Sequence, residues 1–318
     1  MSRSVQSATP KSESGPGPMR RGPPGLQVRL LRWLARWVAQ RTPIQRQALA
    51  CRLAPLAARL AAKRGRIART NLALCFPELS VEAREALWQR SLVTNLKGLL
   101  DACVAWYAEA PVLADHYAIE GLEHLQAALA EGRGVILLGA HFHGSELHMR
   151  AVRELVGVTL RPIVRAFRNA GVDREINGCR RRHLGGVIER GDLQAFCAAV
   201  RRGEVVVYTP DVNLRARNTF APFFGVAAST LDSMPTLLRR AGGVLVPTWA
   251  RPLPDGRYAL RFEAPLPEFP GRDGVAAAQR YNAWVEARVR EAPEAYDWGV
   301  KRFKTRPPGE ADLYARRR

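Results

Sequence analysis

Four residues with acid–base or metal-binding side chains lie within eight positions of one another, directly after an apolar run. They are His141, His143, Glu146 and His148, and the run is Gly134–Ala140. The apolar run is typical of a buried strand, whereas Gly144 followed by Ser145 is typical of the start of a helix. Functional residues in open α/β sheets gather at the carboxyl ends of strands, so this segment is the strongest candidate for a site.

Geometry decides whether His141 and Glu146 can act together. On a continuous helix, positions five apart point roughly 140° away from each other. With His141 on the strand end and Gly144 bending the chain, the two side chains can face one another, and the helix N-terminus stabilises the carboxylate. A neutral imidazole held by a carboxylate is a good general base. We therefore predict that His141 is the base and Glu146 its partner, acting on a substrate hydroxyl.

Two other interpretations of these residues stay open. The four side chains could ligate a metal ion, but their spacing lacks the directly following Asp-His of metal hydrolases, and no distant set of ligands clearly completes a shell. Alternatively, the three histidines are incidental and line a surface or pocket. We expect neither a metal ion nor a cofactor.

The elements that must position this segment follow from the apolar pattern, which alternates short strands with helical stretches. The predicted strands are Tyr117–Ile119, Gly134–Ala140, Thr159–Val164, Val187–Glu189, Val205–Tyr208, Val244–Trp249 and Tyr258–Phe262. The predicted helices are Ser80–Tyr107, Leu122–Glu131, Ser145–Leu155, Val172–Arg182, Leu193–Arg202, Leu231–Arg240 and Val275–Arg290. This alternation predicts an α/β fold with helices on the faces of the sheet.

Positive charge is concentrated at the N-terminus. The 318 residues carry a net charge of +20, and the first 77 residues hold fifteen Lys or Arg and a single acid, Glu13. In Leu26–Gln40, Leu and Trp recur at helical spacing with Arg mostly on the other face, a pattern typical of a helix that lies in a membrane interface. A second helix is expected from Pro43 to Ala62. Neither has the uncharged length that a spanning helix needs, so we expect attachment to an anionic membrane surface.

Three segments with different roles follow from this distribution. Residues 1–25 are rich in Ser, Pro, Gly and Arg and are expected to be a disordered basic tail. Residues 26–62 are expected to be membrane-associating helices, and residues 63–318 the catalytic domain. The positive charge also raises the hypothesis of a nucleic-acid-binding protein. No base-stacking pattern, helix-turn-helix or zinc-binding pattern in the sequence supports that hypothesis, so we expect no nucleic acid partner.

The His141–Glu146 segment, a His and an acid separated by four residues (HX4E), resembles the glycerolipid acyltransferase superfamily. Within it, the chain resembles the late acyltransferases of lipid A biosynthesis, of the lauroyl/myristoyl transferase type. Five further blocks carry the resemblance in the same order: Arg66–Ser80, Val164–Ala170, Gly203–Asp211, Phe220–Gly225 and Tyr296–Pro307.

This resemblance implies a central mixed sheet flanked by helices, with N-terminal amphipathic helices. It also implies transfer of a fatty acyl chain from the phosphopantetheine thioester of acyl carrier protein to a hydroxyl of a phosphorylated glycolipid, a lipid A precursor, at the cytoplasmic face of the inner membrane. By position, His141 is the base and Glu146 its partner; Arg165 and Asn169 belong to a substrate-binding block, and Asp211 to the pocket wall. A lysophospholipid or an amino-acid lipid is the alternative acceptor.

Further basic residues fit the anionic carrier protein and the acceptor phosphates. Arg165, Arg168 and the run Arg180–Arg182 lie near the substrate-binding block, and Lys301, Arg302, Lys304 and Arg306 lie near the C-terminus. Guanidinium and ammonium groups bind phosphate and carboxylate through charge-assisted hydrogen bonds. We expect Arg165 and Arg168 to contact substrate.

Overall fold

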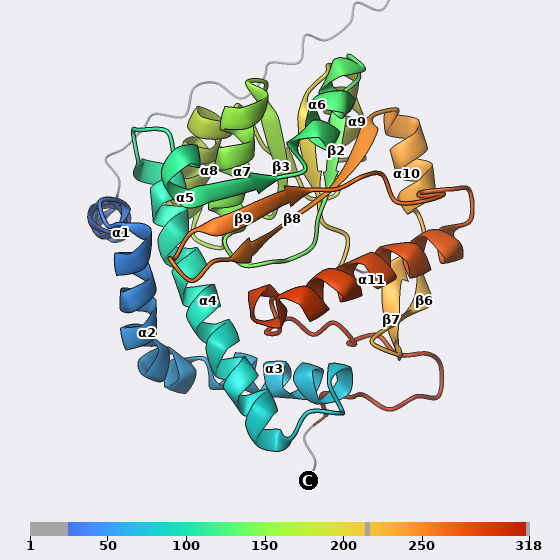
Figure 1. The fold of residues 1–318 in the computed structure, drawn as a ribbon, viewed down its shortest axis with the longest axis horizontal. Coiled ribbons are helices and arrows are strands. Elements are labelled where there is room, and N and C mark those ends of the chain that lie inside the picture. The colour runs from blue at the N-terminus through green and yellow to red at the C-terminus, as the bar shows by residue number, and fades with distance from the viewer. Residues whose placement is uncertain (1–24, 214–216, 316–318) are drawn as a thin grey trace, which may run out of the picture.

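The computed structural model describes residues 25–213 and 217–315 and is built around one seven-stranded sheet (Figure 1). Its strands are β1 (Tyr117–Glu120), β2 (Val135–Leu138), β3 (Leu160–Val164), β4 (Ile188–Glu189), β5 (Val205–Tyr208), β8 (Val244–Pro252) and β9 (Tyr258–Phe262). The order across the sheet is β1-β9-β8-β2-β5-β3-β4. All neighbours are parallel except β8 and β9, which are antiparallel. The predicted mixed α/β sheet and its seven strands are confirmed.

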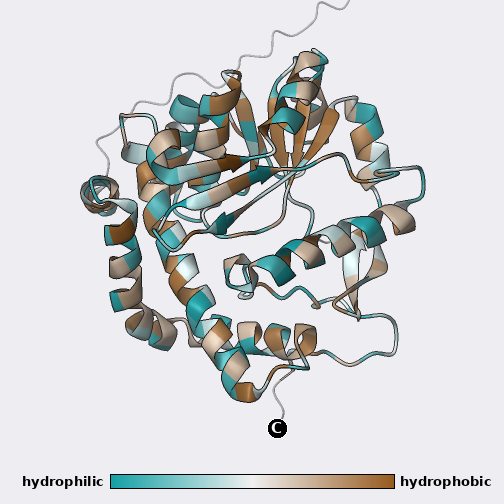
Figure 2. Ribbon diagram, viewed as in Figure 1, coloured by the Kyte–Doolittle hydropathy of each residue, from teal (hydrophilic) through white to brown (hydrophobic). Residues whose placement is uncertain are grey.

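Strand β2 lies at the centre of the sheet, and all four of its residues are buried. A continuous apolar run suits a parallel strand that helices cover on both faces. Val135 and Leu137 point into one core cluster, while Ile136 and Leu138 point into the other. Figure 2 shows this apolar character in the central strands. The strand therefore holds the residues that follow it in a rigid frame.

Helices cover both faces of the sheet. One core cluster joins the sheet to α4 (Val81–Tyr107), α6 (Leu122–Ala130), α7 (Ser145–Val156) and α8 (Ala170–Leu184). The other joins it to α9 (Leu193–Arg201), α10 (Met234–Ala241) and α11 (Gly274–Glu291). A short helix, α5 (Leu113–His116), leads into β1. The helices predicted in these ranges are confirmed, with boundaries shifted by up to three residues.

The N-terminal helices pack on α4. Helices α1 (Leu26–Ala39) and α2 (Pro43–Leu60) both contact α4, and α3 (Ala62–Cys75) crosses its N-terminal half. A buried ion pair fixes α2, because Arg46 Nε lies 2.6 Å from Asp101 Oδ1, and Lys97 Nζ lies 2.6 Å from Asp101 Oδ2. The predicted tail, residues 1–25, lies almost wholly outside the described residues.

Besides the short helices α5 and η1 (Pro293–Ala295), two larger elements were not predicted. Helix α3 is one. The other is the antiparallel hairpin of β6 (Asn218–Phe223) and β7 (Val226–Leu231), which packs on α11. Arg302 is buried and donates to Ser229 O (2.8 Å), Thr230 Oγ1 (2.9 Å) and Asn282 Oδ1 (3.0 Å). Arg302 therefore ties the C-terminal segment to this hairpin and is not available to a substrate phosphate.

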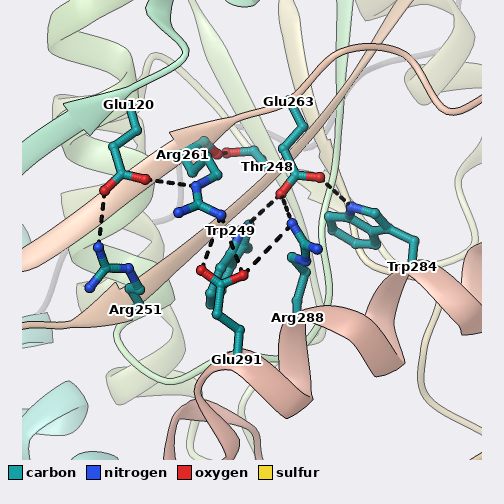
Figure 3. Close-up of polar contacts among 9 residues, drawn as sticks. All are labelled: Glu120, Thr248, Trp249, Arg251, Arg261, Glu263, Trp284, Arg288 and Glu291. Atoms are coloured by element: carbon teal, nitrogen blue, oxygen red, sulfur yellow. Dashed lines mark hydrogen bonds and ion pairs between the residues drawn. The ribbon is translucent and has the colours of Figure 1, made fainter.

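The antiparallel edge of the sheet is joined to α11 by polar contacts (Figure 3). Glu263, directly after β9, accepts from Trp249 Nε1 (3.0 Å), Arg288 Nη1 (2.5 Å) and Trp284 Nε1 (2.8 Å). Arg261 pairs with both Glu120 and Glu291. The network thus connects β1, β8 and β9 with α11, whose C-terminal end leads into the segment beside the histidine loop.

Candidate active site

The loop that carries His141 connects β2 to α7 and is held from both sides. Gly144 adopts a left-handed conformation (φ 85°), which a glycine tolerates, and so allows α7 to start at Ser145. The C-terminal segment clamps the loop through two backbone hydrogen bonds, from Asp297 N to His141 O (3.0 Å) and from His143 N to Ala295 O (2.8 Å). The imidazole of His141 therefore stands at the carboxyl edge of the central strand.

Asp211 is the carboxylate that contacts the imidazole of His141. Its Oδ1 lies 2.5 Å from His141 Nδ1, its Oδ2 accepts from His141 N (2.9 Å), and Tyr296 also donates to Oδ2 (3.1 Å). Asp211 is buried, whereas the side chain of His141 is 41% exposed. Since a carboxylate on Nδ1 places the proton there, the lone pair of Nε2 is free to accept a proton.

The charges of this pair act on each other. Burial by itself would raise the pKa of Asp211, but the charge of His141 and its hydrogen bonds outweigh burial and hold that pKa below its usual range. Burial by itself would lower the pKa of His141, yet the attraction and the hydrogen bond of Asp211 raise it above its usual range. The arrangement thus stabilises an imidazolium, as a general base requires.

The predicted contact between His141 and Glu146 is wrong. Glu146 points from the first turn of α7 toward α8 and α4, where it pairs with Arg180 and accepts from Trp106 Nε1 (3.0 Å). Arg180 Nε lies 3.2 Å from both carboxylate oxygens. The guanidinium of Arg180 and the indole of Trp106 hold this carboxylate between α8 and α4, and Asp211 is the carboxylate on Nδ1 of the imidazole.

A cavity of about 470 Å³ opens in front of the histidine. Its lining includes His141, Glu146, Arg64, Arg165, Arg180 and Asp297 as charged or titratable groups. Leu99, Ala102, Met149 and Phe167 supply an apolar part of the same wall. The cavity therefore presents a base, positive charge and apolar surface together.

The other predicted site residues have different positions. Arg165 lines the cavity as expected, but Asp211 lies behind His141 and not on the wall. Asn169 caps α8, where its Oδ1 accepts from Gly171 N (2.9 Å) and Val172 N (3.1 Å). Neither Asn169 nor the exposed Arg168 belongs to the cavity lining. The structure thus places His141, His143, Glu146, Arg165 and Arg180 in the lining of this cavity, and leaves Asn169, Arg168 and Asp211 out of it.

The remaining histidines of the segment have partners of their own. His143 Nδ1 lies 3.0 Å from Asn95 Nδ2, and His148 lies between Tyr117 Oη (2.7 Å) and His143 O (2.9 Å). Burial lowers the pKa of each imidazole to about 4, so both are neutral at pH 7. Within the described residues, no group of three or more His, Cys, Asp or Glu side chains is placed to hold a metal ion.

The sequence did not predict the residues that contact Glu146 and Asp211. The sequence indicates Arg180 only as part of a basic run, and it assigns Trp106 and Tyr296 no role in the site. One signal for Asp211 was present in the sequence, because this acid, like His141, follows the end of a predicted apolar strand, Val205–Tyr208. Strands β2 and β5 are paired in parallel with Leu138 opposite Tyr208, and His141 and Asp211 each stand three residues beyond these paired positions.

The site is thus a histidine held by a buried carboxylate at the edge of an α/β sheet, in front of a partly apolar cavity, and this arrangement has the chemistry of a general base. Comparison with known proteins gives the class of enzyme. Residues 30–305 match the family described as bacterial lipid A biosynthesis acyltransferase. The chain is 34% identical to a lipid A biosynthesis lauroyltransferase of Escherichia coli (strain K12), over 84% of this chain and 87% of that protein.

Two further relatives from the same strain have other acyl groups in their names. A lipid A biosynthesis palmitoleoyltransferase is 32% identical over 84% of this chain and 87% of its own length. A lipid A biosynthesis myristoyltransferase is 29% identical over 88% and 87%. The chain therefore belongs to the bacterial lipid A biosynthesis acyltransferase family, and it is an acyltransferase enzyme, as its sequence predicted.

Proposed function

We propose that the chain transfers a fatty acyl group from the thioester of acyl carrier protein to a hydroxyl of a lipid A precursor, at the cytoplasmic face of the inner membrane. Membership of the lipid A acyltransferase family is the observation that carries acyl transfer to lipid A. The free Nε2 of His141, at the wall of the cavity, supports a hydroxyl acceptor, because a hydroxyl must lose its proton to become a good nucleophile.

In the proposed mechanism His141 Nε2 takes the proton of the acceptor hydroxyl while the hydroxyl oxygen attacks the thioester carbonyl carbon. The carbon–oxygen bond forms, the carbon–sulfur bond breaks, and the thiolate of the phosphopantetheine leaves. The imidazolium returns its proton to that sulfur, so the base is regenerated. Asp211 holds the imidazole in the productive tautomer and stabilises its charged form.

Glu146 and Arg180 act beside this base in our proposal. Their ion pair is partly buried, with side chains 16% and 9% exposed, and Trp106 adds a hydrogen bond to the carboxylate. Such an ion pair has a defined geometry. It therefore holds the polar side chains of the cavity wall in place beside His141. Arg64 and Arg165, on the same wall, supply positive charge that suits an acceptor phosphate or a developing oxyanion.

The decisive assay incubates the purified protein in detergent with acyl-carrier-protein thioesters and each candidate acceptor, and reads the products by mass. We expect the acylated lipid A precursor from the wild type and at least about a 10²-fold loss of turnover in His141→Ala. His124→Ala, which changes a histidine on α6 outside the cavity, is the matched control. Undiminished turnover in His141→Ala contradicts the mechanism, and acylation of only a lysophospholipid or an amino-acid lipid contradicts the acceptor.

The N-terminal helices support attachment to the membrane surface. Helix α1 buries Val28, Ala35 and Val38 against the protein, yet its larger apolar side chains are exposed: Leu26, Leu30, Trp33, Leu34 and Trp37. Exposed Trp and Leu flanked by Arg are typical of a helix in a membrane interface. None of the helices among the described residues is both long and apolar enough to cross a bilayer.

A further inference from the structure

A second cavity, of about 750 Å³, lies between α3 and the C-terminal segment, apart from the one that contains His141. Its polar lining consists of Lys63, Arg66, Arg69, Thr70, Lys301 and Tyr314. Four of these side chains carry positive charge, and no acidic residue belongs to the described lining. A concave surface of one sign concentrates ions of the other sign, so the cavity favours an anion.

Three of the four cations have no counterion among the residues that the structure describes. Arg69 is neutralised by Glu85, whose carboxylate it contacts at 2.6 and 2.8 Å. Lys63, Arg66 and Lys301 form no ion pair within the described residues, and Lys301 Nζ lies 5.0 Å from the ring centroid of Tyr314. Because like charges that share a cavity repel each other, a bound anion would relieve an unfavourable arrangement.

The surroundings of the cavity indicate which anion it takes. Helix α3 follows α2 directly, and the last turns of α2 expose Leu56 (54%) and Leu60 (80%). Exposed apolar side chains therefore shortly precede Lys63 and Arg66 in the chain. Apolar residues followed by Lys and Arg are typical of the boundary between acyl chains and headgroups, where the anions are lipid phosphates.

The basic cavity is also close to the histidine loop. Asp297 donates its backbone N–H to His141 O, and Lys301 follows four residues later, a stretch that spans at most roughly 14 Å. On α3, Arg64 lines the catalytic cavity while its neighbour Lys63 lines the basic one. One helix thus forms part of the walls of both cavities.

We propose that the cavity of Lys63, Arg66 and Lys301 binds the phosphate of a lipid headgroup. The inference rests on the proposed function only for the case in which the phosphate belongs to the acceptor. The other source of the same group is an anionic phospholipid of the surrounding bilayer. In both cases the three cations hold phosphate oxygens by charge-assisted hydrogen bonds.

The test compares two triple variants of the full chain that remove the same charge. The cavity variant is Lys63→Gln/Arg66→Gln/Lys301→Gln. The control variant is Arg190→Gln/Arg240→Gln/Arg272→Gln, which changes exposed residues outside the cavity that do not belong to α1, α2 or α3. Binding is measured without acyl donor, to phosphatidylcholine vesicles that contain either phosphatidylglycerol or a bisphosphorylated lipid A precursor, and by calorimetric titration with inorganic pyrophosphate.

We expect the cavity variant to bind pyrophosphate at least about ten-fold more weakly than the control variant. The single variants Lys63→Gln and Lys301→Gln should have affinities between those of the two triple variants. Vesicle binding then identifies the source: a loss confined to the precursor vesicles identifies the acceptor, and an equal loss with phosphatidylglycerol identifies the bilayer lipid. Equal pyrophosphate binding by the two triple variants overturns the proposal. Since no turnover is required, failure of the proposed acyl transfer leaves this result unaffected.

Discussion

In the proposed mechanism, the reactivity of His141 depends on one buried acid, Asp211. The carboxylate raises the pKa of the imidazole by charge attraction and by a hydrogen bond, against the lowering effect of burial. Since the base must be neutral, activity rises with pH through that pKa. In Asp211→Asn the attraction is lost, so we expect the acid limb of kcat/KM to move to lower pH while the maximal rate falls by about 10²–10⁴-fold. The measurement is a pH profile of initial rates.

A control distinguishes this effect from a general loss of charge. Asp255→Asn removes an exposed acid that pairs with Arg257, and we expect its pH profile to match that of the wild type. An unmoved acid limb in Asp211→Asn would show that the carboxylate does not set the protonation of His141.

At the same scale, the sequence predicted a candidate histidine at the end of β2 but not the carboxylate that contacts it. His141 was found because it follows an apolar strand, and this signal is local. Glu146 was chosen because it is close in sequence, whereas Asp211 is 70 positions away. Its proximity depends on the pairing of β2 with β5, and the order of strands in a parallel sheet cannot be deduced from the spacing of residues along the chain. The buried Arg180 that receives Glu146 depends on helix packing in the same way.

At the scale of elements, the seven sheet strands were predictable because apolar runs in buried strands are strong signals. The β6–β7 hairpin lacks such a run: Asn218–Phe223 contains Pro222, and only two of its six residues are buried. Helix α3 was missed because Gly65 and several Lys and Arg obscure its apolar side. Elements that depend on tertiary contacts for their stability leave weak patterns in the sequence.

The junction of β9 with α11 gives a test at this scale. Glu263 accepts hydrogen bonds from two indoles and one guanidinium (Figure 3). Glu263→Ala leaves these donors without their partner in a partly buried place, so we expect the free energy of unfolding to fall by about 2–4 kcal/mol. Glu268→Ala, which removes the partner of Arg280 at an exposed position, should cost less than about 1 kcal/mol. Chemical denaturation in detergent measures both, and equal losses would contradict the assigned role of Glu263.

At the scale of the whole molecule, the N-terminal helices α1 and α2 expose an unusual amount of apolar surface. An ordinary surface helix turns its large apolar residues inward, whereas α1 and α2 turn mainly Ala, Val and Arg46 inward and expose Leu, Ile and Trp. The catalytic cavity adds Leu99 (61%) and Phe167 (40%) to the exposed apolar residues. A bilayer covering α1 and α2 would therefore remove from water the surface that the fold leaves exposed.

The indoles of Trp33 and Trp37 test this orientation. They are 64% and 43% exposed, and burying each in the interface contributes roughly 1.5–3 kcal/mol. We expect Trp33→Ala/Trp37→Ala to bind anionic vesicles at least about ten-fold more weakly in flotation assays, with turnover in detergent retained because neither indole lines the catalytic cavity. Leu193→Ala/Val275→Ala truncates exposed apolar residues of α9 and α11 and should bind like the wild type. If both double variants float as the wild type does, α1 does not carry the attachment, and the membrane must contact another face of the molecule.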